Sequence, residues 1–314
     1  MPTSTRIRIG TAGWSYKDWD GIFYPAGMRR RGHPLELIAQ CFDVVEINTS
    51  FYGHIKPELA KLWARKVAAV NSQFLFTAKL HRSFTHSPIA VMEPTSAATI
   101  QPGEEDERFA RQGLDALAST GKFGALLIQF PVSFKNTSLN REYLETLLRQ
   151  FIEYPRVVEV RHSSWDNAET LAYFTQKNVA FCNIDQPLIG RALDAREYVT
   201  SPVGYVRLHG RNYDMWFEAE KGEDRYNYLY NENELLEWRN KIEHIAQKAE
   251  VTYVITNNHF EGKAGVNALQ LKHMLSGQRV KAPEPLLKHY PQLKSIADPV
   301  SDDGEPELPL SLSS

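Results

Sequence analysis

Charged side chains close several apolar runs of this sequence, and the stretch VVEVRHSSWDN at residues 157–167 shows the pattern plainly. Glu159 and Arg161 stand two residues apart there, and residues with that spacing point to the same face of a β-strand. Burying an unpaired charge costs several kcal/mol. The two side chains therefore either neutralise one another inside the fold or are placed for a ligand.

The same spacing recurs at the ends of other apolar runs. The further pairs are Glu46 with Asn48, Lys79 with His81, Asn183 with Asp185, and Arg207 with His209. Gln129, Asn257 and Asn258 hold the corresponding late positions of two more runs. If these faces point inward, one polar layer brings together three cations and three carboxylates, namely Lys79, Arg161, Arg207, Glu46, Glu159 and Asp185.

Such a layer suits acid/base chemistry on an anion. Lysine and arginine form charge-assisted hydrogen bonds to carboxylate or phosphate groups, so we expect an anionic small molecule as the ligand. Histidine titrates near neutrality and carboxylate pKa values shift readily in such surroundings. The candidate catalytic residues are Glu46, Glu159, Asp185 and His209. We predict a metal-independent hydrolase, lyase or isomerase, with the reaction left open.

A second group of residues is predicted to bind and orient the substrate. It combines the cations and amides of the polar layer with aromatic side chains that follow strand ends, which could stack on a ligand or simply pack the loops. Its members are Trp14, Asn48, Tyr52, Lys79, His81, Gln129, Arg161, Trp165, Arg207, Tyr228, Asn257 and Asn258.

Three alternatives stay open. The carboxylates with His81, His209 and His259 could ligate a metal, but no HExxH or DxDxDG spacing occurs and three cations would repel a divalent ion, so neither metal nor cofactor is expected. Aromatic loops over a cationic mouth could bind nucleic acid, although the formal net charge of -2 and the pI of about 6.6 argue against it. The polar layer could also be a self-paired scaffold without catalysis.

Eight short segments carry these residues, and each begins apolar and ends polar. They are residues 7–13, 44–52, 74–81, 124–131, 157–165, 179–185, 204–210 and 252–259, with amphipathic helical patterns between most of them. Alternation of strands and helices indicates a parallel sheet, and eight strands close a barrel. The sequence lacks GxGxxG and GxxxxGK[ST], which weakens the case for an open nucleotide-binding sheet. We predict an α/β protein, a single-domain (β/α)8 TIM-like barrel with its site at the C-terminal mouth.

The boundaries follow from composition. We place the barrel domain at residues 1–281 and expect a loosely ordered C-terminal tail at 282–314, which is rich in proline. Long polar loops at 82–107 and 211–230 would overhang the mouth. The N-terminus lacks a secretory signal, no run could cross a bilayer, and the two cysteines read as free buried thiols. We therefore expect a cytoplasmic protein without a membrane partner.

Several longer strings carry a family resemblance. GTAGWSYKDWDGIFYP, VVEINTSFYG, FTAKLHRSFTH, LLIQFPVSF, VEVRHSSW, YVRLHGRN and VITNNHFEGKAGVNALQLKHML together resemble the domain-of-unknown-function-72 family, over roughly residues 6 to 276. The resemblance implies a TIM-like barrel and no established reaction. The barrel looks similar to those of metal-dependent endonucleases and sugar isomerases, which is the basis for considering a repair-associated role.

Overall fold

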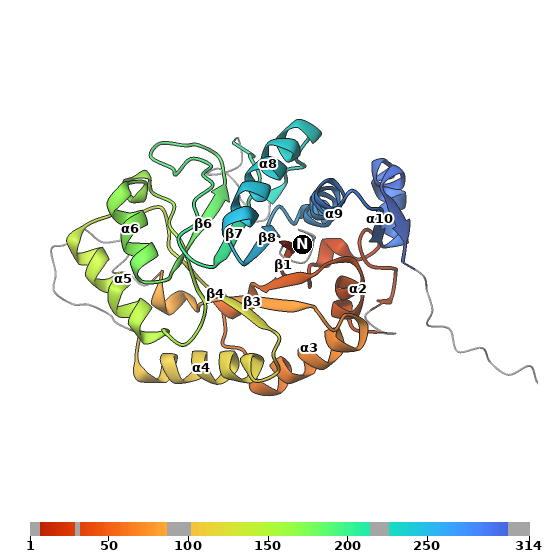
Figure 1. The fold of residues 1–314 in the computed structure, drawn as a ribbon. Coiled ribbons are helices and arrows are strands. Elements are labelled where there is room, and N and C mark those ends of the chain that lie inside the picture. Colours follow the sequence, from red (N-terminus) through yellow and green to blue (C-terminus); the bar gives the residue numbers. More distant parts are fainter. Residues whose placement is uncertain (1–6, 29–31, 87–101, 214–225, 301–314) are drawn as a thin grey trace, which may run out of the picture.

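The computed structural model describes residues 7–28, 32–86, 102–213 and 226–300 (Figure 1). Its centre is a closed barrel of parallel strands, in which each strand pairs with its neighbours in chain order and β8 pairs back to β1. The strands are β1 (Ile7–Ala12), β2 (Val44–Ile47), β3 (Leu75–Lys79), β4 (Phe123–Gln129), β5 (Arg156–Glu159), β6 (Ala180–Asp185), β7 (Val203–Leu208) and β8 (Val251–Thr256). The predicted TIM-like barrel is confirmed.

Helices surround the barrel on its outside, as Figure 1 shows. They are α2 (Pro34–Cys41), α3 (Pro57–Val70), α4 (Glu104–Ala118), α5 (Ser138–Gln150), α6 (Ala168–Gln176), α8 (Glu232–Lys248) and α9 (Lys263–Ser276). Residues 186–202 connect β6 to β7 without a helix. No helix within the described ranges is long and apolar enough to cross a membrane.

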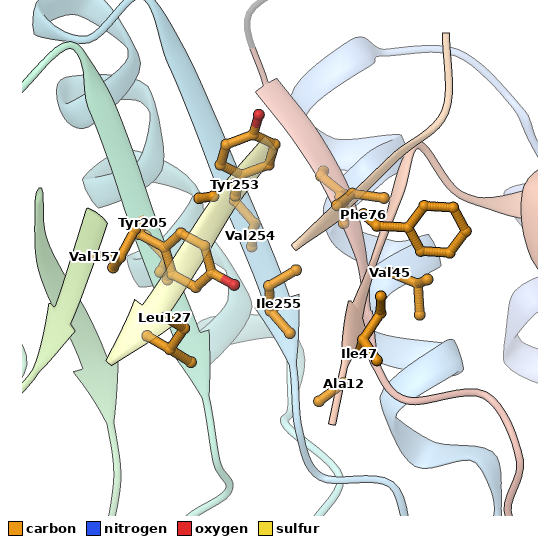
Figure 2. Packing of buried hydrophobic residues seen from close by; sticks show 14 of the residues in the cluster. Ala12, Val45, Ile47, Phe76, Leu127, Val157, Tyr205, Tyr253, Val254 and Ile255 are labelled. Atoms are coloured by element: carbon orange, nitrogen blue, oxygen red, sulfur yellow. The ribbon is translucent and has the colours of Figure 1, made fainter. Parts of the chain in front are cut away.

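Contacts across the barrel identify the inward face of each strand. The Tyr205 hydroxyl on β7 lies 2.9 Å from Glu46 on β2 and 2.8 Å from Thr77 on β3, and neither of these strands is a neighbour of β7. Alternation then turns Arg207 inward as well. Figure 2 shows Tyr205 beside Leu127 and Val157 in the buried interior. Both cysteines are free and buried, as predicted.

Local signals explain where several helices begin. The side chain of His33 accepts a hydrogen bond at the first turn of α2, and the Glu36 carboxylate accepts one from the His33 backbone N–H. Asn231 and Glu234 form the same reciprocal arrangement at the start of α8. Four acidic residues fill the first turn of α4, where the partial positive charge of the helix N-terminus favours them.

The C-terminal segment corrects one prediction. Residues 282–300 are packed rather than loosely ordered: β9 (Val280–Ala282) pairs in parallel with β10 (Ala297–Pro299), and α10 (Glu284–His289) and the 3-10 helix Pro291–Ser295 lie between them. Leu286 and Leu293 are fully buried. The prolines that suggested disorder instead begin α10 and the 3-10 helix, where a missing N–H is harmless. Residues 301–314 lie outside the described ranges.

Candidate functional site

Eight predicted side chains meet at the C-terminal end of the barrel, and we call them the central cluster. They come from the ends of β2, β3, β4, β5, β7 and β8, and all but Arg161 are almost completely buried. The members are Glu46, Lys79, Gln129, Glu159, Arg161, Arg207, His209 and Asn257. Active sites of such barrels occupy this end.

Arg207 is the centre of the cluster. Its guanidinium donates to Glu46 over 2.7 Å, to Glu159 over 2.6 Å and to the Gln129 side-chain oxygen over 3.2 Å. The Tyr205 hydroxyl donates to the second oxygen of Glu46. Since Arg207 pairs with two carboxylates, its contacts favour a role in holding the cluster together over the predicted role in holding a ligand.

Glu159 is held ionised between two guanidiniums. Arg161 donates to its Oε1 over 2.7 Å, and Arg207 to its Oε2. Burial opposes ionisation, but the charges of Arg207 and Arg161 outweigh it and keep the pKa of Glu159 well below its usual range. The backbone of Arg161 is fixed in turn, because its carbonyl accepts a hydrogen bond from the Leu193 N–H in the β6–β7 connection.

His209 is neutral in this setting. Its Nδ1 lies 2.9 Å from the Asn257 amide, and its Nε2 lies 3.4 Å from Glu159. Burial lowers the pKa of His209 to about 3, against the opposing charge of Glu159. An imidazole with that pKa carries no charge at neutral pH. It therefore positions its neighbours and stays neutral around pH 7, whereas the sequence suggested an imidazole that titrates there.

Lys79 is the cation that the cluster does not pair. Its ammonium lies 3.9 Å from the centre of the Phe51 ring, and within the described ranges no carboxylate forms an ion pair with it. Burial and the positive charge of Arg207 lower the pKa of Lys79 to about 7. The cluster thus holds one amine that gains and loses a proton near neutrality.

Asn48 extends the cluster towards β1. Its side chain donates to the hydroxyl of Tyr16, and burial raises the pKa of that tyrosine. The buried Asn48 side-chain oxygen has no hydrogen-bond partner in the described part of the chain, and the same holds for the oxygen of Asn257. Buried acceptors without donors are costly unless something fills them, so these two oxygens mark places for a ligand or for water.

Asp185 does not belong to the central cluster. It pairs in register with Leu208, whereas the preceding residue Ile184 pairs with the inward-facing Arg207, so the Asp185 side chain points outward. There it forms an ion pair of 2.9 Å with Arg211, which also contacts Glu234 on α8. Its predicted catalytic role is therefore not supported by its position.

Two more residues predicted to bind the substrate belong to the network of Asp185, Arg211 and Glu234 outside the barrel. Tyr228 donates its hydroxyl to Glu234 over 2.6 Å. Asn258 donates to the Tyr228 carbonyl and to Asn267 on α9, both over 2.8 Å. These contacts fasten the β7–α8 connection to the outer helices, so we assign both side chains to structure.

Of the aromatic side chains predicted to contact a ligand, some pack in the interior and one is exposed. The positive φ of 77° at Gly13 turns the chain after β1, and Trp14 packs against Trp63 of α3 at 5.1 Å between ring centres. Trp165 is buried, stacks on Phe134 and donates to its carbonyl over 2.7 Å. Only Tyr52 is free to meet a ligand, with 69% of its surface exposed.

His81 turns to the side of the barrel. Its ring lies 4.4 Å from that of His54, which is 3.5 Å from Asp106 on α4, and ligand atoms of the three lie within 4.8 Å of one another. Ser83 already occupies Nδ1 of His81, and the ring also hydrogen-bonds to the Tyr52 backbone. A metal ion there would have to displace a hydrogen bond, so we assign this group no metal.

Sequence reasoning missed several contributors. Tyr205 and Thr77 lie two residues before Arg207 and Lys79 on the same inward faces, so the alternation that found the cations also marks them. Cys182 lies 3.9 Å from Glu159 on the inward face of β6. Phe51 is one of the aromatic residues that follow strand ends, but that pattern does not predict its partner. The 3-10 helix Thr49–Phe51, which follows β2, brings its ring to Lys79.

Comparison with known proteins places the chain in a family. It matches the family described as "Protein of unknown function DUF72" over residues 8–290. The chain belongs to the DUF72 family. A relative, the UPF0759 protein YunF of Bacillus subtilis (strain 168), is 26% identical over 287 residues, which span 86% of this chain and 94% of that protein.

Two solved DUF72 structures share the fold. The protein TM1631 of Thermotoga maritima MSB8 is 32% identical with a TM-score of 0.72, covering 86% of this chain and 99% of that one. The protein EF0366 of Enterococcus faecalis V583 is 25% identical with a TM-score of 0.71, covering 86% and 95%. These DUF72 names state no substrate, so activity is argued from the site alone.

Proposed function

We propose that this DUF72 protein is a metal-independent acid/base enzyme that binds a phosphorylated or carboxylated small molecule at the C-terminal mouth of its barrel. One observation carries the proposal. With Asp185 outside, the central cluster holds three cations, Lys79, Arg161 and Arg207, against two carboxylates, Glu46 and Glu159. An anion would restore neutrality, whereas a self-paired scaffold would already be neutral.

The positions of the cations assign their roles. The Arg161 side chain is 16% exposed, and its guanidinium can offer remaining N–H groups to an incoming anion. Lys79 supplies the unpaired charge and is the group whose pKa suits proton transfer near neutral pH. Glu159 keeps Arg161 oriented. The unpartnered oxygens of Asn48 and Asn257 would accept hydrogen bonds from hydroxyl or amine groups of the substrate.

A thermal-shift screen tests the proposal. The chelator-treated protein is titrated with phosphate, sulfate, acetate and sugar phosphates, since a ligand of the folded state raises Tm. We expect phosphate or a sugar phosphate to raise Tm without metal, and Lys79→Met and Arg161→Met to remove the shift. Lys66→Met is the matched control, because that lysine is paired with Glu36 on the outer surface.

Two outcomes of the screen would count against the proposed function. Absence of any anion-induced shift, or an equal shift in all variants, would contradict the proposal. Stabilisation only by single-stranded DNA, falling steeply with salt, would favour the nucleic-acid-binding alternative instead.

A further inference from the structure

Lys79 is surplus to the ion pairing of the cluster. Both oxygens of Glu46 are taken, by Arg207 and Tyr205, and both oxygens of Glu159 are taken, by Arg161 and Arg207. A lysine placed to neutralise a buried acid would contact one of these oxygens. Lys79 instead lies over the Phe51 ring, which stabilises an ammonium through the ring face without competing for its nitrogen.

The groups that face Lys79 keep its amine available. Arg207 and Arg161 add positive charge, while Glu46 and Glu159 oppose them. His86, whose ring meets that of Phe51 edge to face at 4.9 Å, has a pKa lowered to about 4 by burial and by Lys79. It is therefore neutral at pH 7 and accepts no proton from the amine. Arginine cannot lose its proton in this range, so lysine adds a capacity that Arg161 lacks.

We infer that Lys79 is a nucleophile that forms an imine with the carbonyl carbon of an anionic aldehyde or ketone, while Arg161 holds the carboxylate or phosphate group of that substrate. The inference rests on the proposed function and narrows its substrate class to 2-oxo acids and phosphorylated carbonyl compounds. A buried, polar but unpaired amine at the end of a barrel strand is the geometry that such chemistry requires.

The bond changes balance without any further reactant. The neutral Nζ adds its lone pair to the carbonyl carbon, and the carbonyl π electrons move to oxygen to give a carbinolamine. A proton moves from the nitrogen to that oxygen, and the proton that the ammonium released to solvent before the attack returns to the resulting hydroxyl. The hydroxyl then leaves as water while the nitrogen lone pair forms the C=N bond of a protonated imine. Overall, an ammonium and a carbonyl give an iminium and water, with no oxidant or reductant. The bound anion stabilises the iminium charge.

Reductive trapping tests the inference directly. The full-length protein is incubated with cyanoborohydride and either glyoxylate or dihydroxyacetone phosphate at several pH values, and labelled lysines are located by peptide mass spectrometry. An ordinary lysine is about a thousandfold less deprotonated at pH 7 than one with a pKa near 7. Allowing for the weaker nucleophilicity of the less basic amine, we expect Lys79 to be labelled at least about tenfold faster than Lys66.

Variants separate the possible explanations. Lys79→Met should lose the label, Lys66→Met should keep it, and uncharged acetone should label Lys79 more slowly than the anionic probes. Lys79→Arg preserves the positive charge, so it should retain the anion-induced rise in Tm while taking no label. That variant keeps the test valid if Lys79→Met fails to fold. A labelling rate half-maximal near pH 7 would support the assignment.

Equal labelling of Lys79 and Lys66, or labelling that survives in Lys79→Met, would overturn the inference. Anion-induced stabilisation without any label at Lys79 would refute imine formation and leave the proposed function standing. If neither stabilisation nor label occurs, both proposals fail.

Discussion

Replacement of Arg207 by methionine should destabilise the fold in a pH-dependent manner. Arg207 is 1% exposed and pairs with Glu46 and Glu159. In the variant Glu159 keeps Arg161, but among the residues that the structure describes Glu46 keeps only the Tyr205 hydroxyl. Removing one partner of a buried pair typically costs about 3 to 5 kcal/mol.

The loss of unfolding free energy in Arg207→Met can also be calculated from the Glu46 carboxyl, which loses its guanidinium partner. Protonating a glutamate carboxyl that has lost its buried partner costs about 1.36 kcal/mol per pH unit above the ordinary glutamate pKa of about 4.3, or about 3.7 kcal/mol at pH 7 and about 1 kcal/mol at pH 5. The folded variant then binds more protons than the unfolded chain, so its stability falls as pH rises. Destabilisation should therefore be large at pH 7 and small at pH 5.

Urea unfolding followed by tryptophan fluorescence at both pH values measures this difference. Arg239→Met is the control, because its pair with Glu243 is 3.1 Å long on the surface of α8 and should contribute less than about 1 kcal/mol. An Arg207→Met variant as stable as the wild type at pH 7, or equally destabilised at both pH values, would refute the charge-pairing account.

Four other outcomes are expected. Lys79→Met should raise Tm at pH 7, because it removes a buried ammonium without an ionic partner; a fall in Tm would contradict this. Phosphate affinity, measured by calorimetry, should be greatest below pH 7. It should weaken as pH rises through the Lys79 pKa of about 7, because Lys79 then loses its positive charge. Asp185→Asn should leave the phosphate-induced rise in Tm unchanged, since Asp185 faces Arg211 outside the barrel, and loss of that rise would place it in the site. Leu293→Ala should cost about 2 to 5 kcal/mol of unfolding free energy, whereas a neutral effect would return residues 282–300 to a loosely ordered tail.

The strands and the central cluster were largely predictable, because buried parallel strands are continuous apolar runs and inward positions alternate. That rule places Glu46, Glu159 and Arg207 at late strand positions, and contacts across the barrel identify their face as the inward one. Asp185 was misassigned because alternation defines two faces without saying which one is inward. Only the pairing of Ile184 with Arg207 decides it, and strand register is a property of the closed barrel.

Residues beyond the strand ends were less predictable. The rule fails at Trp14, where the positive φ of Gly13 ends the extended backbone, and at His81, where the 3-10 helix Arg82–Phe84 begins. The neutrality of His209 was equally hidden, because it depends on complete burial. Burial of a polar side chain follows from everything packed around it.

The two buried cysteines lie in different layers of the molecule, so their reactivity reports on the motion of each layer. Cys182 lies beneath Glu159 inside the barrel, while Cys41 ends α2 in the outer helical layer, where Lys272 of α9 donates to its carbonyl. A thiol reagent reaches each sulfur only when the layer above it opens. Labelling rates at the two positions would therefore time the detachment of the helical shell separately from the opening of the barrel, with no engineered probe.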